Sequence, residues 1–364
     1  MSAAYDDALR ILTGTNSEYG GRTNHGSTVA MALIEMDRPD AVLPWVQRYR
    51  HRLEGRQPTK KMLTRHNYST ALGVMGRASD WVAFFQRELV ERDWKVVLNN
   101  WMPRLAPGLA GAAGNGLLRV AHAVRSLEEG AGNLRKAELA EGLAYWAARY
   151  LNLPGIPAGA GAGRLTPVEA LAVIKWQNQD EQPEFGQISE GLRGLRGFTP
   201  FAGVINLAAL PADPGELISQ ITEIFVRLLP AHREFPDLQI PFIKAVVVPS
   251  ALRSLLPYLE PDTNTLLLRY AWQLAAALYT VFGRAKPAEA HDHAATDPMQ
   301  LRNQAVATGN EFVIIFTAAC LREYGYLPRP DYLLAAVQAR EMFTPQTQGP
   351  PVAIDPYLPR YKDQ

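Results

Sequence analysis

Cysteine is almost absent from this chain, which holds a single one, Cys320, among 364 residues. A lone cysteine excludes a disulfide framework and every metal site built on several thiolates. Its apolar surroundings predict a buried filler rather than a nucleophile. An excess of charge is missing too, because 37 basic residues balance 36 acidic ones to a formal net charge of +1. We therefore expect no nucleic-acid partner and no anionic membrane surface, since both require a basic stripe or tail.

Long apolar runs and a targeting signal are also missing. The first ten residues are polar and show no basic region followed by an apolar stretch, which predicts no secretory signal. The most apolar long segment, residues 266–282, contains Arg269 and Gln273. It falls short of the roughly 20 clean apolar residues that a membrane span requires. The sequence thus predicts a cytoplasmic protein with no membrane contact.

Helical periodicity is what the sequence has in abundance. Apolar residues such as Trp81, Phe84 and Leu89 recur at steps of three and four, which places an apolar stripe along one helix face. The pattern predicts helices over residues 28–36, 42–50, 81–89, 117–128, 138–150, 167–177, 214–229, 250–257, 265–282, 301–324 and 331–342. Alternation is nearly absent, and only residues 240–248 resemble a strand, confined by a proline near each end. The expected fold class is all-α.

We expect one large helical domain over residues 1–343, with connections rich in proline and glycine. Residues 344–364 contain five prolines and are predicted to form an extended C-terminal strap on the surface. The glycine-rich stretch 154–163 is a predicted loop and a candidate internal hinge, which we expect to be mobile and to lie over or beside the mouth of a pocket. It is no phosphate cradle, because no strand precedes it and no Gly-Lys-Ser/Thr follows.

Two of the seven histidines stand out. His25 precedes Gly26-Ser27-Thr28 at a predicted helix start, where Ser27 or Thr28 is the expected cap. His122 lies on an otherwise apolar helix, and Asn115, Arg119 and His122 follow the spacing i, i+4 and i+7, which puts them on one side. A hydrogen-bonded core histidine is the simpler interpretation of His122, and a functional cluster is the alternative.

The remaining histidines carry weaker signals, since no spacing among the seven matches a recognised metal motif. His291 and His293 flank an aspartate in a loop, where a solvated turn is the simpler interpretation and a pair of metal ligands is the alternative.

The segment 114–125, Gly-Asn-Gly-Leu-Leu-Arg-Val-Ala-His-Ala-Val-Arg, resembles the central motif of the questin oxidase-like family. Further similarity runs in order through Asn24-His25-Gly26 and residues 38–42, 101–108, 142–150 and 249–253, and on to Glu311 and Thr317. The resemblance covers most of the chain. It implies an enzyme of aromatic polyketide metabolism that oxidatively opens anthraquinone-type rings. For some members it also implies iron held by histidines and a lysine modified by carbon dioxide.

The chain departs from the family pattern where the resemblance implies metal ligands. Asn115 and Lys244 stand where the family carries histidines, and Phe312 and Ile315 replace a histidine and a lysine in the late helix. Only His25 is kept, and one imidazole is too few to hold iron. We therefore predict no metal. No flavin or nicotinamide fingerprint is present either, so we predict no bound cofactor.

These observations predict a metal-independent enzyme of specialised metabolism that acts on a bulky hydrophobic, polyketide-derived substrate. We expect an oxidoreductase, because the resemblance implies oxidation. The predicted catalytic residues are His122, His25 and Lys244, with His122 transferring protons and Lys244 or Asn115 stabilising an enolate or phenolate oxygen. The predicted substrate-binding residues are Asn115, Arg119, Tyr145, Phe312 and Ile315. The alternatives are a redox-neutral cyclase or isomerase that uses the same pocket and a catalytically silent ligand-binding protein. The oligomeric state stays open.

Overall fold

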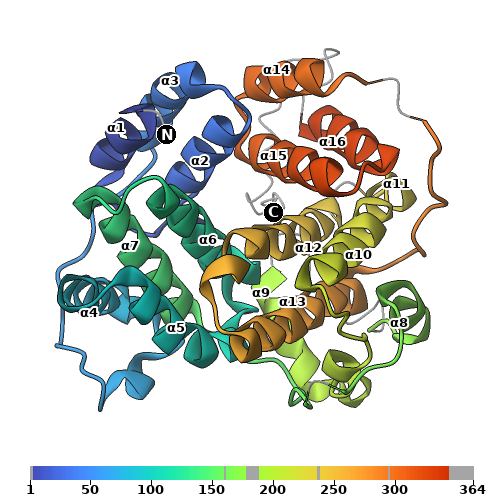
Figure 1. Cartoon of the computed structure of the whole chain (residues 1–364), viewed down its shortest axis with the longest axis horizontal. Coiled ribbons are helices and arrows are strands. Elements are labelled where there is room, and N and C mark those ends of the chain that lie inside the picture. The colour runs from blue at the N-terminus through green and yellow to red at the C-terminus, as the bar shows by residue number, and fades with distance from the viewer. Residues whose placement is uncertain (1–2, 160, 178–187, 236–237, 294–295, 344–364) are drawn as a thin grey trace, which may run out of the picture.

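The computed structural model of the chain describes residues 3–159, 161–177, 188–235, 238–293 and 296–343. These ranges hold sixteen α-helices and one antiparallel hairpin of two short strands (Figure 1). The all-α class and the single helical domain are therefore confirmed. The predicted C-terminal strap over residues 344–364 lies outside the described residues.

The elements follow one another in chain order, with short 3-10 helices in several connections. The α-helices are α1 Ala3–Leu12, α2 Gly26–Glu35, α3 Pro39–Arg50, α4 Ala78–Glu91, α5 Trp94–Leu105, α6 Asn115–Glu128, α7 Asn133–Arg149, α8 Pro167–Val173, α9 Ile188–Gly194, α10 Pro214–Val226, α11 Leu228–Ala231, α12 Gln239–Ala251, α13 Pro261–Phe282, α14 Pro298–Thr308, α15 Glu311–Tyr326 and α16 Pro330–Phe343. The strands are β1 Glu18–Tyr19 and β2 Arg22–Thr23. The 3-10 helices are η1 Tyr68–Ala71, η2 Met75–Arg77, η3 Ala106–Gly108, η4 Gly111–Gly114, η6 Leu195–Gly197, η7 Thr199–Phe201, η8 Val204–Asn206, η10 Leu252–Ser254 and η11 Leu256–Tyr258.

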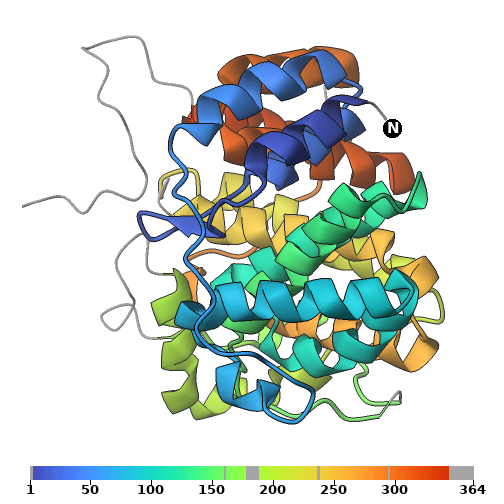
Figure 2. The same cartoon turned by 90° about the vertical axis from the view of Figure 1, so that its left-hand side faces the viewer.

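The two ends of the described chain pack against each other. Figure 2 shows the first helices, in blue, stacked on the last ones, in orange and red, at one end of the molecule. Helix α2 packs on α15, and the indole N–H of Trp45 in α3 donates to the carbonyl of Gly309, 2.8 Å away. Helices α4, α5, α6 and α7 form a second group, and α12 lies between α6, α10, α13 and α15. The centre of the fold is therefore α12.

The predicted strand over residues 240–248 is wrong, because this segment is the middle of helix α12. Every residue of α12 is buried, so its sequence is apolar on almost every side, with Lys244 as the one charged residue, and carries neither the period of a strand nor that of an amphipathic helix. Pro241 falls in the first turn, where a missing N–H leaves no helical bond unmade, and Pro249 falls in the last turn. The segment resembles a strand because it is rich in β-branched residues, which favour strands.

Several predicted helix boundaries also differ from the structure. The segment 301–324 is divided at Gly309, whose φ of 62° ends α14, and Asn310 then caps α15 by accepting from the N–H groups of Phe312 and Val313. The segment 250–257 is the end of α12 followed by two 3-10 turns, and 167–177 is helical only to Val173. Helices α1, α5 and α9 were not predicted at all.

One segment of the described chain, Gln239–Tyr258, is long and apolar enough to cross a membrane by length and composition alone. Its most apolar window is 78% buried inside the protein, as in the core helix of a soluble protein. The segment contains α12, so its position at the centre of the fold accounts for its composition. The lone Cys320 is buried as well.

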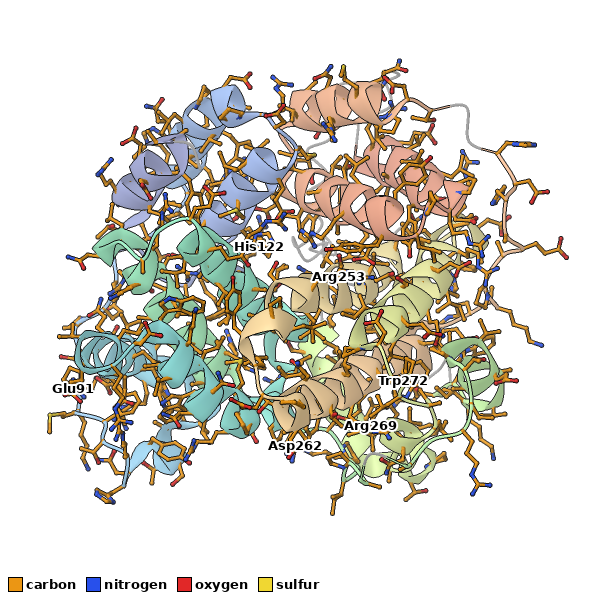
Figure 3. The ribbon with its side chains drawn as sticks, viewed as in Figure 1. Glu91, His122, Arg253, Asp262, Arg269 and Trp272 are labelled. Atoms are coloured by element: carbon orange, nitrogen blue, oxygen red, sulfur yellow. The ribbon has the colours of Figure 1, made fainter. Side chains whose placement is uncertain are left out.

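The glycine-rich stretch is fastened to the helices beside it. Gln273 of α13 donates to the carbonyl of Pro154, 2.9 Å away, and Asn206 donates to that of Ile156, also 2.9 Å away. Arg269, labelled on α13 in Figure 3, donates to the carbonyl of Ala162. These bonds hold the stretch near both of its ends. The interpretation as a hinge stays a prediction.

Candidate active site

A cavity of about 300 Å³ opens where the hairpin β1–β2, η4 and α9 meet the starts of α2, α6 and α15 and the side of α12. Its polar and charged lining residues are Glu18, Arg22, Thr23, His25, Asn115, Arg149, Ser189, Glu190, Arg193, Lys244 and Glu311. The apolar lining is confined to Phe312, Ile188, Ala112 and Ala113. This lining is more polar than the bulky hydrophobic substrate predicted from the sequence would require.

Lys244 lies on the cavity wall from the middle of α12 and is only 4% exposed. Its ammonium donates to the amide oxygen of Asn115 at 2.7 Å, and Nζ lies 5.5 Å from the centre of the Phe312 ring. Among the described residues, no carboxylate lies within ion-pair distance of it. Burial lowers the pKa of Lys244 from 10.5 to about 8, and the nearby Glu311 partly opposes this shift.

Asn115 connects Lys244 to a chain of hydrogen bonds that ends on the hairpin. The amide nitrogen of Asn115 donates to the hydroxyl of Thr23 at 2.9 Å, which lies 2.8 Å from the hydroxyl of Tyr145. Tyr145 donates to the carboxylate of Glu18 at 2.8 Å, and Arg149 donates to the same carboxylate at 2.6 Å. Since the amide nitrogen is used by Thr23, the amide oxygen faces Lys244. The amine thus has a neutral acceptor instead of a counter-charge.

The backbone that leads into Asn115 is strained. Ala112, Ala113 and Gly114 have φ values of 48°, 52° and 82°, so three consecutive residues adopt the left-handed conformation. Only glycine adopts it readily, and each alanine there costs about 1–2 kcal/mol. Both alanines line the cavity. Backbone outliers of this kind cluster at functional sites.

Glu311 begins α15 and contributes a carboxyl group to the cavity. Its Oε2 atom is buried and has no hydrogen-bond partner among the described residues. Burial raises the pKa of Glu311 from 4.5 to about 7, against the opposing effects of the Lys244 charge and a hydrogen bond with Tyr49. A carboxyl group of this kind is half protonated near neutral pH.

His25 lies at the N-terminus of α2, 4% exposed, with its ring edge-on to Phe312 at a centroid distance of 5.8 Å. Its backbone N–H donates to the hydroxyl of Tyr49 at 2.9 Å. Burial and the cations of Lys244 and Arg119 hold the pKa of His25 well below its usual value, so the imidazole is neutral at neutral pH. The expected side-chain cap is wrong, because Ser27 donates instead to Glu138 at 2.6 Å.

Three other predicted binding residues lie outside the cavity lining. Arg119 forms a buried, two-pronged ion pair with Glu138, at 2.6 and 2.9 Å, which joins α6 to α7. Tyr145 lies behind Thr23 in the hydrogen-bond chain. Ile315 is buried in the apolar core, one turn of α15 beyond Phe312. Each therefore supports the wall of the site rather than its surface.

His122 is also separated from the cavity, in contrast to the predicted grouping. It is 4% exposed on α6, near α2 (Figure 3), and bonds to the backbone of Thr28. Its Nδ1 atom is buried without a partner among the described residues. Burial lowers its pKa to about 4, with Glu35 opposing and Arg322 reinforcing the shift. His122 thus belongs to the buried ionic group around Glu35, and its catalytic role has no geometric support.

The iron site that the family resemblance implies does not fit these residues. His25 is the single imidazole among the described residues of the lining, Lys244 donates to an amide, and Phe312 offers no ligand atom. No three His, Cys, Asp or Glu side chains in the described part of the chain gather as a metal site would require. His291 bonds to Asp331 at 2.8 Å, in a loop that does not reach the cavity.

Glu311 and the hairpin also line the cavity, although neither is among the predicted site residues. A signal for the hairpin existed. Gly20 and Gly21 separate Tyr19 from Arg22 and have φ values of 50° and 76°, which is the two-residue turn that a pair of glycines favours. The predicted position of the glycine-rich stretch beside the mouth has no support, since none of its described residues lines the cavity.

No protein-family model and no curated protein matches this chain. The resemblance to the questin oxidase-like family therefore stays an expectation that rests on the motifs described above.

Proposed function

We propose that this chain is an enzyme that ionises a phenolic or enolic compound of the polyketide type in the cavity and oxidises the resulting anion with dioxygen. The observation that carries the proposal is Lys244, a buried amine on a cavity wall whose acceptor is an amide. Functional sites are where such perturbed groups gather. Oxidation is the reaction that the family resemblance implies.

Lys244 suits the first step because its pKa lies near neutrality. With a pKa of about 8, roughly a tenth of the molecules carry a neutral amine at pH 7, ready to take the proton of a phenol or enol. The ammonium that results then lies beside the new anion and stabilises it. The neutral ring of His25 on the same wall is a second group able to accept a hydrogen bond from the substrate.

In the oxidative step, an electron pair of the substrate anion forms a carbon–oxygen bond to dioxygen. The peroxide that forms takes the proton back from Lys244, so the substrate is oxidised and dioxygen is reduced without a further electron donor. The polar lining favours a substrate with several hydroxyl and carbonyl groups over a wholly apolar one. Phe312 and Ile188 supply the apolar contact that one face of an aromatic ring needs.

A redox-neutral cyclisation or isomerisation is the second candidate, and the pair Lys244 and Glu311 favours it. Their pKa values, about 8 and about 7, both lie close to neutral pH. One group is thus able to remove a proton from a carbon while the other returns a proton elsewhere. Both candidates begin with the same ionisation of the substrate. They differ in whether the anion then reacts with dioxygen or takes up a proton at another atom.

The test uses a panel of hydroxylated anthraquinones and naphthols with the wild-type chain, Lys244→Met and, as a control, Lys95→Met. Lys95 is exposed and lies over two aromatic rings, away from the cavity. We expect oxygen uptake in proportion to product, lost in Lys244→Met and kept in Lys95→Met. A product of unchanged mass without oxygen uptake would support the isomerase. A phenolate absorption shift with no product would support a silent binding protein, and no binding would overturn the proposal.

A further inference from the structure

We propose that the amine of Lys244 forms an imine with an aldehyde or ketone group of the compound in the cavity, so that the substrates are carbonyl compounds. The proposal rests on the proposed function only in that it places a small molecule beside Lys244. It names the bond that holds the molecule there, and it is tested without any turnover.

The surroundings of Lys244 are those of a nucleophilic amine rather than of a structural cation. A carboxylate partner would hold the amine protonated, but its hydrogen-bond acceptor is the neutral amide oxygen of Asn115, at 2.7 Å. The Asn115 oxygen is fixed in place because the other end of the amide donates to Thr23. A neutral amine that donates one hydrogen to Asn115 still keeps its lone pair for a carbonyl carbon. Desolvated lysines of this kind form Schiff bases.

The site also has a group for the proton that imine formation must deliver. The nitrogen lone pair of Lys244 adds to the carbonyl carbon, and the former carbonyl oxygen takes a proton to give a carbinolamine. That hydroxyl must then be protonated to leave as water, while the nitrogen gives up its second hydrogen and the C=N bond forms. The reaction consumes one amine and one carbonyl group and releases one water, with no change of oxidation state.

Glu311 is placed to supply the proton for the departing water. It lines the same cavity as Lys244 and interacts with its charge, and its Oε2 atom has no hydrogen-bond partner among the described residues. Its raised pKa, about 7, keeps a protonated fraction at neutral pH. The carboxylate left behind is the base that the nitrogen needs for its second hydrogen. An imine would also acidify the neighbouring C–H bond, which links this step to the enol chemistry proposed above.

The experiment traps the imine on the full-length chain. The protein is incubated near neutral pH with 4-hydroxybenzaldehyde and cyanoborohydride, which reduces the imine to a secondary amine. Intact mass and peptide mapping then locate the adduct, whose added mass is that of the aldehyde less one oxygen atom. We expect one adduct on Lys244, formed at least about tenfold faster than on exposed Lys95, because each unit of pKa changes the neutral amine fraction about tenfold.

Two variants and one control variant sharpen this result. Asn115→Asp gives Lys244 a counter-charge in place of the amide oxygen, so we expect the rate of labelling at Lys244 to fall at least about tenfold. Glu311→Gln removes the proton donor and is expected to slow labelling, whereas Lys95→Arg leaves the rate at Lys244 unchanged. Because Lys244 and Lys95 are compared within one wild-type molecule, the experiment does not depend on any variant folding.

The outcomes separate this proposal from the proposed function. An adduct on Lys244 without oxygen uptake on phenolic compounds would uphold the imine and reject the oxidation. If oxygen uptake requires Lys244 but Lys244 is never labelled by the aldehyde, the oxidation is upheld and the imine is rejected. Labelling spread evenly over the exposed lysines, or unaffected by Asn115→Asp, would overturn the imine.

Discussion

Replacing Lys244 by methionine is expected to flatten the dependence of stability on pH in the alkaline range. Burial lowers the pKa of Lys244 from 10.5 to about 8 on folding. Between these two values the unfolded chain binds a proton that the folded chain has released. The free energy of unfolding of the wild type therefore rises with pH across this window, and Lys244→Met, which has no amine, lacks the rise.

The magnitude follows from the size of the shift. The full difference of about 2.5 pKa units corresponds to about 3 kcal/mol, of which about 2 kcal/mol is regained between pH 7 and pH 9.5. The stability at a single pH does not isolate this effect, because the variant also leaves the oxygen of Asn115 without its donor, at about 1–3 kcal/mol. The slope isolates it, since that loss is the same at every pH.

Urea unfolding of both proteins at several pH values between about 7 and 9.5 measures the difference. Over this range we expect the free energy of unfolding of the wild type to rise by about 2 kcal/mol relative to that of Lys244→Met. Lys95→Met changes an exposed lysine, so its free energy of unfolding should depend on pH as that of the wild type does. Curves for the wild type and Lys244→Met that stay parallel within about 0.5 kcal/mol would refute the reasoning. The amine would then be solvated like one on the surface, and both proposals would lose their central group.

Three further changes give separate tests. The pKa of Glu311 is about 7 in the folded chain against 4.5 in the unfolded chain, so the free energy of unfolding of the wild type falls by about 2 kcal/mol between about pH 5 and pH 7. Glu311→Gln should remove this fall, which urea unfolding at the two pH values measures. An equal fall in the wild type and the variant would contradict the prediction. His122→Gln should leave turnover in the cavity within about threefold, since this residue does not line it, and a loss of a hundredfold or more would restore its catalytic role. Gly163→Ala should lower the free energy of unfolding by at least about 2 kcal/mol, because the φ of Gly163 is +89° and a methyl group there would overlap the carbonyl of Ala208. Gly159→Ala is the control, since Gly159 has open space around it, and should change the free energy of unfolding by less than about 0.5 kcal/mol. Thermal unfolding of both variants measures the difference.

The fold was predictable wherever a helix presents one face to the core. The stripe through Trp81, Phe84 and Leu89 predicted α4, and the predicted helix over residues 42–50 is α3, which also buries one face. It failed for α12, because a helix at the centre of a domain has no polar face to set the period. It also joined α14 to α15 across Gly309, where only the positive φ marks the break. Periodicity identifies most readily the helices that are half buried, whereas Lys244 of the site lies on α12, which is fully buried.

The candidate site was predicted in part. Asn115, Lys244 and Phe312 lie on three different helices, His25 directly precedes a fourth, and all four line one cavity. The family resemblance, not periodicity, is what grouped them. The i, i+4, i+7 grouping with His122 failed for a geometric reason. Seven residues advance about 10 Å along a helix, so side chains on one face meet different neighbours.

The cavity concentrates features that cost stability, and this argues for its use. Ala112 and Ala113 are held in the left-handed conformation, at about 1–2 kcal/mol each, and Lys244 is buried against a neutral amide. Glycine at residue 112 is a simple change that would relieve part of this cost. A fold that served only to be stable would have no reason to hold all of these at one cavity, whereas a site that needs a reactive amine beside a fixed acceptor does. The strained turn sets the first residue of α6, and Asn115 is that residue. The strained backbone therefore directly precedes Asn115, whose hydrogen bond with Lys244 is the one on which the proposed chemistry depends.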